Sequence, residues 1–297
     1  MMPEMDGFEV CRRLKENPAI RHIPIIFITS VNTTSEKTKS FKLGAVDYIT
    51  KPFDSLEVKA RVKTHLSLKL HQEALKNHNI ILEEKVKERT KELVETKKEI
   101  VERLGLAAEH RDLETGQHIK RISEYCRLLG KFMGLTPVDY NRVALASTMH
   151  DLGKIGIQDS ILSKQGKLSE KEMAIMKTHP EIGAKILSGS KSKLLKLAEK
   201  ICLTHHEKWD GSGYPFGIAG KAIALAARLV ALADVYDALT CKRVYKEPMP
   251  HEKVRQIIIE ESGKHFDPKV VDAFLATEDQ FQTVALEMRS EGDKENE

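Results

Sequence analysis

The residues most able to do chemistry are a histidine-aspartate doublet, His150-Asp151, and Lys154, which follows three residues later. Imidazole nitrogens and carboxylate oxygens are the atoms that hold catalytic divalent metals in proteins. Side chains of these two types recur on both sides of the doublet, and with it they form one set: Glu114, His118, His150, Asp151, His179, His205, His206 and Asp234. So many candidate ligands in one stretch of chain predict a site for more than one metal ion.

Taken one at a time, the members of this set are ambiguous. Glu114 and His118 are four residues apart, which places them on one face of a helix, yet such pairs are common on protein surfaces. His150-Asp151 ends an apolar helical pattern and could equally be a cluster of charges at a helix terminus. A histidine at a helix end, such as His179 or His205, is often a partner of the helix dipole.

Asp234 decides between these interpretations. It lies in residues 228–236, a segment that is otherwise almost wholly apolar. An unpaired carboxylate buried there would be costly, and a bound metal removes that cost. We therefore interpret the set as a polynuclear metal site.

Helices must position most of these residues. Between residues 105 and 284, apolar side chains recur at intervals of three and four, which is typical of amphipathic helices. Glycine and proline gather in one long loop, residues 210–220. We expect an all-helical domain over residues 105–284, followed by a polar, disordered tail at residues 285–297.

The first part of the chain, residues 1–66, has a different pattern. Residues 23–30 form a continuous apolar run that predicts a strand buried on both faces, and residues 46–49 form a shorter one. Helical patterns flank them at residues 7–15, 35–43 and from 55 onward. Strands that alternate with helices indicate a parallel α/β sheet, although two strands are too few for an independent one.

Residues 67–104 join the two parts and are highly charged and helix-favouring. Apolar residues recur there at steps of seven and four, and the pattern is interrupted by Arg89, Thr96 and Arg103. A single solvated helix is one interpretation. A parallel two-stranded coiled coil, and hence a homodimer, is the preferred one, with a seam formed by Leu75, Leu82, Val86, Leu93 and Ile100.

Composition narrows the class of protein. The chain is 41% hydrophobic and 31% charged, which is ordinary for a globular protein, and its net charge of +4 gives no support to a nucleic-acid role. The four cysteines are scattered, as expected for reduced thiols in the cytoplasm. No signal peptide and no apolar run long enough to cross a membrane is evident, so we expect a cytoplasmic protein without membrane contact.

Residues 1–66 resemble the second half of a response-regulator receiver domain. The resemblance rests on Met2-Pro3, Met5-Asp6-Gly7, Thr29, Gly44-Ala45, Asp47-Tyr48 and Lys51-Pro52. In that family the phosphate-accepting aspartate precedes the methionine matched by Met2 by three residues. We therefore expect no phosphorylation site within this chain, which makes a histidine kinase a doubtful partner. The chain is either an incomplete version of a longer protein, which we prefer because half a sheet exposes apolar surface, or a decayed receiver kept for packing or dimerisation.

Residues 105–270 resemble an HD-GYP domain, a subgroup of the HD metal-dependent phosphohydrolases. The matching motifs are Glu114 to His118 with Arg121, His150 to Lys154, His205 to Pro215, Asp234 to Leu239, Arg243 to Lys246, and His265 to Pro268. The resemblance implies that all eight residues of the set are metal ligands, and it associates Glu114 with a third ion. Val244 and Ala224 depart from the family pattern without touching a ligand.

The resemblance also implies a reaction. The expected substrate is cyclic di-GMP, opened to pGpG, with onward cleavage to GMP left open. The expected cofactors are two or three divalent ions, Fe or Mn, bridged by Asp151. Lys154 would contact the scissile phosphate, and other contacts are expected from Gly213, Tyr214, Arg243 and Lys246.

Two alternatives for the function stay open at this stage. The domain could act on another cyclic dinucleotide such as cyclic GMP-AMP. It could also bind a nucleotide or a partner protein without turnover, as a signalling adaptor. A diguanylate cyclase or another signalling protein is a candidate partner. In fold class we expect a mainly α protein, with an all-helical HD-type domain joined by a long coiled-coil-like helix to a partial α/β, flavodoxin-like receiver fragment.

Overall fold

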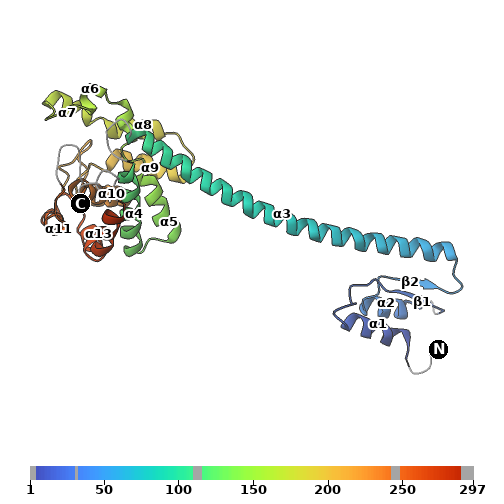
Figure 1. Ribbon diagram of the computed structural model, residues 1–297. Helices are drawn as coiled ribbons and strands as arrows, with labels where there is room; N and C mark the ends of the chain where they lie inside the picture. The colour runs from blue at the N-terminus through green and yellow to red at the C-terminus, as the bar shows by residue number, and fades with distance from the viewer. Residues whose placement is uncertain (1–4, 31–32, 110–115, 242–247, 289–297) are drawn as a thin grey trace. The chain divides into compact units, whose positions relative to one another are not determined.

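A computed structural model describes residues 5–30, 33–109, 116–241 and 248–288 (Figure 1). Within them the chain is mainly helical and has two strands, as the sequence predicted. It divides into two compact units, residues 1–92 and residues 93–297. The elements of the first are α1 (Gly7–Glu16), β1 (Ile26–Thr29), α2 (Thr34–Lys42), β2 (Asp47–Thr50) and the start of α3 (Ser55–Glu109).

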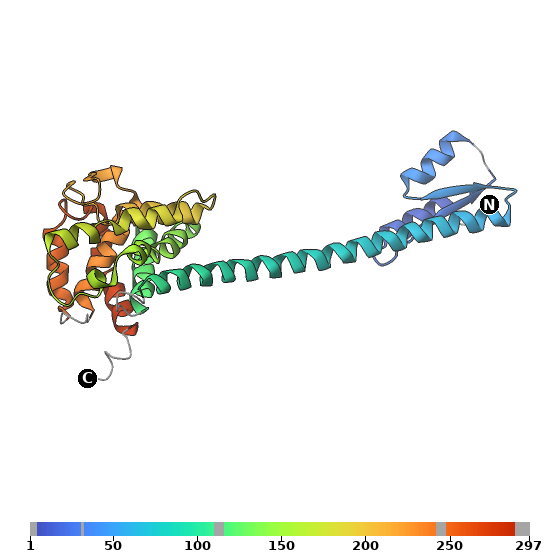
Figure 2. The same cartoon turned by 90° about the horizontal axis from the view of Figure 1, so that it is seen from above.

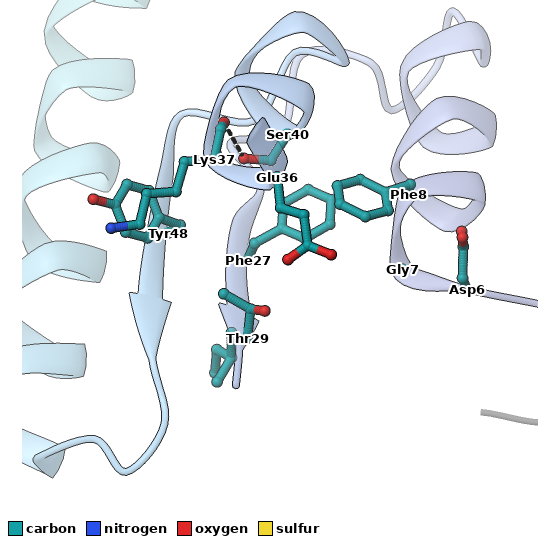
Figure 3. A pocket seen from close by; sticks show the side chains of 10 residues that line it. Asp6, Gly7, Phe8, Phe27, Thr29, Glu36, Lys37, Ser40 and Tyr48 are labelled. Atoms are coloured by element: carbon teal, nitrogen blue, oxygen red, sulfur yellow. Dashed lines mark hydrogen bonds between the residues drawn. The ribbon is translucent and has the colours of Figure 1, made fainter. Parts of the chain in front are cut away.

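The first unit is built around a parallel pair of strands. Ile26 of β1 lies opposite Asp47 of β2, and the register continues to the ends of both strands. Helix α1 begins where the Asp6 carboxylate accepts a hydrogen bond from the backbone N–H of Glu9, at 2.8 Å. It packs against β1 through the rings of Phe8 and Phe27, whose centres are 5.4 Å apart (Figure 3).

The expectation of a strand buried on both faces is wrong. Strand β1 starts only at Ile26, and none of its residues is fully buried; Ile28 is 46% exposed. A parallel strand is buried when neighbouring strands and helices cover it, and β2 is its only paired neighbour in the described part of the chain. A hollow of about 300 Å³ lies beside β1, between Phe27, Thr29 and Tyr48 (Figure 3). This part of the sheet therefore leaves apolar surface open.

Helix α3 is 55 residues long and changes character along its length. Near its start Arg61 pairs with Asp47 at 2.8 Å. Every residue from Leu70 to Ile100 is exposed, and burial begins again at Val101. No helix among the described residues is long and apolar enough to cross a membrane.

The helix continues through Gly105, where the sequence placed the start of the helical domain. A Cβ atom at this position would lie 2.3 Å from the carbonyl oxygen of Thr148. Glycine here allows α3 to approach the chain that follows α5, and Ala108 then joins the core of the second unit. The end of α3 is therefore part of that unit rather than a separate connector.

The remaining elements of the second unit are short helices. They are α4 (Gln117–Phe132), α5 (Pro137–Ser147), η1 (Leu152–Gly156), α6 (Asp159–Leu162), α7 (Glu170–Met176), α8 (His179–Leu187), α9 (Lys193–Thr204), η2 (Gly220–Ala222), α10 (Leu225–Thr240), α11 (His251–Glu260), α12 (Pro268–Leu275) and α13 (Glu278–Glu287). Figure 2 shows them gathered around the end of α3. Helix α13 runs past the expected domain end at residue 284, and residues 289–297 of the expected tail lie outside the described residues.

The core of this unit lies between α4, α5, α9 and α10. Tyr125 of α4 is fully buried, and its ring stacks on Phe281 of α13 with the ring centres 4.4 Å apart. Helix α10 is buried along most of its length because its residues from Ala226 to Ala233 are all apolar or aliphatic, apart from Arg228. These contacts stabilise the helices from which the candidate ligands project.

A second close approach fixes η1 against α8. A Cβ atom on Gly153 would lie 1.8 Å from the carbonyl oxygen of His179 and 2.5 Å from the backbone nitrogen of Gly183. No side chain fits this gap, so glycine is required if η1 is to lie on α8. The contact brings the turn that carries Asp151 to the first residue of α8, His179.

We therefore expect Gly153→Ala to separate η1 from α8 and to lower the free energy of unfolding by about 1–3 kcal/mol or more, the usual cost of overpacking. Thermal unfolding of the full chain measures this. The control is Gly7→Ala in the first unit, where the new Cβ meets nothing closer than 3.4 Å. Equal melting temperatures for Gly153→Ala and the wild type would contradict the proposed role of this contact.

Candidate metal centre

The doublet lies in a tight turn between α5 and η1. Helix α5 ends at Ser147, whose carbonyl oxygen accepts from the backbone N–H of His150 at 3.1 Å. The backbone N–H of Lys154 then bonds the carbonyl oxygen of Asp151 at 2.9 Å, which begins η1. His150 is buried, with 1% of its surface exposed, whereas Asp151 is partly exposed. The turn therefore directs two neighbouring side chains into the same interior region.

One group of candidate ligands joins α4, the turn and α10. It consists of His118, His150 and Asp234, each of which offers one ligand atom within 4.8 Å of the others. His118 Nε2 lies 3.6 Å from Asp234 Oδ1. The packing of α4 on α10 sets this distance, because the two side chains come from facing positions on these helices.

A second group joins the same turn to α8 and to the end of α9. It consists of Asp151, His179, His205 and His206, with ligand atoms again within 4.8 Å of one another. His179 and His205 approach to 3.5 Å between their Nε2 atoms. The structure therefore brings together all seven of the predicted ligands that fall among the described residues. Glu114, the eighth, lies outside them.

Asp151 lies between the two groups. Its Oδ1 atom is 3.1 Å from His179 Nε2 and 3.4 Å from His205 Nε2, both in the second group. Its Oδ2 atom is 3.5 Å from His150 Nε2, in the first group. One carboxylate thus faces ligand nitrogens of both groups, the arrangement that a bridging ligand requires.

Backbone carbonyls orient three of the imidazoles. The Nδ1 atoms of His150, His179 and His205 lie 2.9 Å from Ser147 O, 2.8 Å from Met176 O and 3.0 Å from Cys202 O, respectively. A carbonyl oxygen only accepts hydrogen bonds, so each Nδ1 carries the proton and each Nε2 keeps its lone pair. Hydrogen bonds of this kind are the usual support for metal-binding histidines.

A buried carboxylate orients a fourth imidazole, that of His118. His118 Nδ1 lies 2.7 Å from Asp237 Oδ2, and Asp237 also accepts two hydrogen bonds from the guanidinium of Arg121, at 2.6 and 2.8 Å. All three residues are at most 4% exposed. Burial alone would raise the pKa of Asp237, but the bonds from Arg121 and His118 hold it well below its ordinary value. Asp237 is therefore an anion that fixes the tautomer of His118.

The charge states of the site suit metal binding. Burial lowers the pKa of His150. Burial, and then the neighbouring His205, hold the pKa of His206 well below its ordinary value, so both imidazoles are neutral at neutral pH. Burial would raise the pKa of Asp151, yet the ammonium of Lys154 holds it well below its ordinary range. Neutral imidazole and ionised carboxylate are the forms that coordinate metals.

The residues present fit a divalent metal centre. His150 Nε2 and Asp151 Oδ1 are fully buried and make no hydrogen bond within the described part of the chain. Buried polar atoms are nearly always satisfied, so the convergence of these two on one region is what a metal-binding site requires. The donors are nitrogen and oxygen without thiolate, which suits first-row ions such as Fe, Mn or Zn.

The predicted substrate contacts are only partly described. Lys154 Nζ lies 2.8 Å from Asp151 Oδ2, at the edge of the centre. The ring of Tyr214 stacks on His206, with centres 4.7 Å apart and planes at 22°. Gly213 is needed because a Cβ there would lie 2.3 Å from the backbone nitrogen of Lys208. Arg243 and Lys246 lie outside the described residues.

Sequence reasoning missed two buried carboxylates. Asp237 lies one turn after Asp234 on the same apolar helix, so the argument applied to Asp234 could have found it. Glu207 is 2% exposed; its Oε1 accepts from the backbone N–H of Phe216 at 2.8 Å, while its Oε2 has no hydrogen bond from any described residue. Its position directly after His205-His206 was the available signal.

The comparisons with known proteins agree with this geometry. The pattern that defines the HD domain matches residues 105–270, and that of the response regulator receiver domain matches residues 1–63. A Vibrio cholerae protein named as a probable cyclic di-GMP phosphodiesterase is 44% identical over 98% of this chain and 69% of its own length. The response regulator RpfG of Xanthomonas campestris, named a cyclic di-GMP phosphodiesterase, is 40% identical over 95% of this chain and 75% of its own. A Vibrio cholerae 3'3'-cGAMP-specific phosphodiesterase is 46% identical over 64% of this chain and 36% of its own.

The chain belongs to the HD domain family, and membership implies divalent metal binding. Within that family it is an HD-GYP protein, with a receiver-type segment at residues 1–63.

Asp237→Asn tests the support of His118. The change leaves the Arg121 guanidinium buried without its counter-charge, so we expect a loss of about 3–5 kcal/mol in the free energy of unfolding at pH 7. Because the pKa of Asp237 is lowered by folding, its contribution is present above the ordinary aspartate pKa and is lost as pH falls below about 4. Wild type and variant should therefore converge in acid. Denaturant unfolding across this pH range measures the difference, with Asp272→Asn, at an exposed position of α12, as the control. A difference that stayed constant with pH would contradict this account.

Proposed function

We propose that the chain is a metal-dependent phosphodiesterase that opens cyclic di-GMP to pGpG, with onward cleavage to GMP as a second step. The observation that carries the proposal is the position of Asp151, which faces buried imidazole nitrogens of both ligand groups. The names of the relatives that align with nearly the whole chain support the same reaction.

We propose that the eight residues predicted from the sequence are the metal ligands, with Glu114 reserved for a third ion. The ions proposed are Fe or Mn, since carboxylate and imidazole donors without thiolate suit both. When bound, such ions would supply Lewis acidity toward a phosphodiester and would allow water to ionise at neutral pH. Asp151 would hold them together as the shared ligand.

The chain itself would contribute a positive charge beside the phosphodiester that is cut. Hydrolysis adds water to phosphorus, breaks the bond between phosphorus and a ribose oxygen, and leaves a proton on that oxygen. Negative charge grows on the phosphoryl and leaving oxygens as this bond breaks. The ammonium of Lys154, held 2.8 Å from Asp151, is the cation positioned to stabilise that charge.

Cyclic GMP-AMP is a second candidate substrate. The similarity to a 3'3'-cGAMP-specific phosphodiesterase favours cyclic GMP-AMP as the competitor of cyclic di-GMP. Turnover of both nucleotides, measured side by side on the same metal-loaded protein, distinguishes them. A chain that binds either nucleotide without opening it would instead be a signalling adaptor.

Asp151→Ala tests the reaction. Loss of the carboxylate removes the ligand common to both groups, so we expect turnover of cyclic di-GMP to be abolished. The control is Asp279→Asn, an exposed carboxylate on α13, which should keep wild-type turnover. The measurement is the rate of pGpG formation by chromatography. A metal-loaded, reduced wild type that forms no linear product would contradict the proposal.

We also propose that α3 forms a parallel dimer with a second copy of the chain. The residues of the predicted seam are exposed to between 46% and 69%, which is unusual for leucine, valine and isoleucine: Leu75, Leu82, Val86, Leu93 and Ile100. Burying such a stripe against an identical helix removes apolar surface from water.

Two adjacent residues provide a matched test of this dimer. Leu93 lies in the seam and Val94 beside it, and both are well exposed, at 69% and 63%. We expect Leu93→Glu to weaken the dimer because it places like charges in the seam, and Val94→Glu to leave it intact. Sedimentation equilibrium measures the association constant. Equal effects of the two changes would contradict the predicted register.

A further inference from the structure

Lys177 lies beside the candidate metal centre without belonging to it. It follows α7 and precedes His179 by two residues. Its ammonium nitrogen lies 5.1 Å from the centre of the Tyr214 ring. That ring in turn stacks on the imidazole of His206, one of the second ligand group. A cation is thus connected to the centre through an aromatic ring.

The ring that holds Lys177 is itself fixed on both sides. The backbone N–H of Tyr214 donates to the carbonyl oxygen of His206 at 3.2 Å. Two residues later the backbone N–H of Phe216 donates to the buried carboxylate of Glu207 at 2.8 Å. Since Glu207 is 2% exposed, this hydrogen bond lies in the interior. The position of the Tyr214 ring is therefore set by the segment that carries the ligand His206.

The loop is also fixed at its entry. The backbone N–H groups of Trp209 and Asp210 donate to the carbonyl oxygens of His265 and Lys264, at 3.1 and 2.8 Å. Gly211 turns the chain with a φ of +84°, a conformation that side chains disfavour. Tyr214 therefore occupies a set place relative to His206, and it offers Lys177 a fixed partner.

The charge of Lys177 is not paired with a carboxylate among the described residues, whereas that of Lys154 is. Lys154 is engaged by Asp151 at 2.8 Å. Lys177 is exposed. Among the described residues its ammonium contacts the Tyr214 ring and has no carboxylate within ion-pair distance. A cation over an aromatic face keeps its N–H groups free to donate to an anion.

We propose that Lys177, held on Tyr214, binds the phosphodiester of the cyclic dinucleotide that is not being cut. The inference rests on the proposed function, because a cyclic dinucleotide carries two phosphodiesters in one ring. While one is attacked at the metal centre, the other keeps its negative charge outside it. Lys177 lies beside the metal centre, and no carboxylate of the described residues neutralises it. Its loss should therefore weaken a substrate with two phosphodiesters more than a substrate with one.

The test compares two substrates on the full, manganese-loaded chain. Cyclic di-GMP has two phosphodiesters, and bis(p-nitrophenyl) phosphate has one. We expect Lys177→Gln to raise KM for cyclic di-GMP about tenfold, the effect of losing one charge-assisted hydrogen bond. The rise should be several times larger than any rise in KM for bis(p-nitrophenyl) phosphate. Lys177→Arg, which keeps the charge and the ring contact, should restore most of the affinity.

Lys185→Gln is the matched control, because Lys185 is an exposed lysine of the neighbouring helix α8. It should leave both KM values unchanged. Equal changes in KM for the two substrates with Lys177→Gln, or no change, would overturn the role of Lys177. The dissociation constant of cyclic di-GMP, measured in parallel by equilibrium dialysis, separates this inference from the reaction. If the wild type binds cyclic di-GMP without opening it, the proposed reaction is refuted, and the role of Lys177 is then tested by the effect of Lys177→Gln on the dissociation constant. If the wild type neither binds nor opens cyclic di-GMP, the proposed reaction and the role of Lys177 are both refuted.

Discussion

The second unit depends on the orientation of buried imidazoles. His150, His179 and His205 each use Nδ1 to donate to the backbone carbonyl oxygen of the residue three positions earlier. This bond satisfies one nitrogen locally and leaves the other to face the interior. These three histidines follow the C-terminal ends of helices, because carbonyl oxygens free to accept are found there. His150 comes after the end of α5, His179 after the end of α7 and His205 after the end of α9.

The two aspartates Asp151 and Asp237 have different roles in the site. Asp151 faces both groups of nitrogens, while Asp237 stays behind His118 and is paired with Arg121. A carboxylate that faces ligands must keep lone pairs unengaged, whereas one that supports a ligand is best saturated with hydrogen bonds. The two aspartates differ in this way, which is why they are not interchangeable despite similar burial of their surroundings.

The structure groups seven of the residues that the sequence predicted as ligands, whereas sequence reasoning missed the carboxylates that lie behind them. Histidine and aspartate at helix ends are visible as residue types, and the apolar surroundings of Asp234 indicated a cost that a metal removes. The structure assigns the deepest burial to Asp237 instead, while Asp234 is partly exposed. Two carboxylates one turn apart on the same helix cannot be ranked by pattern, because a small rotation of α10 exchanges their environments. Strand β1 shows the same limit: its apolar run was read correctly as a strand, but burial depends on neighbours that a local pattern does not contain.

The candidate ligands among the described residues are proposed to form two metal positions that share Asp151. Manganese bound per chain, measured by inductively coupled plasma mass spectrometry after loading and removal of free metal, tests it most directly. His118→Ala and His206→Ala alter different groups, so each should lower the wild-type count by one ion, and Asp151→Ala should lower it by two. An Asp151→Ala protein that keeps the wild-type count, or a His118→Ala protein that loses as much metal as Asp151→Ala, would contradict the claim.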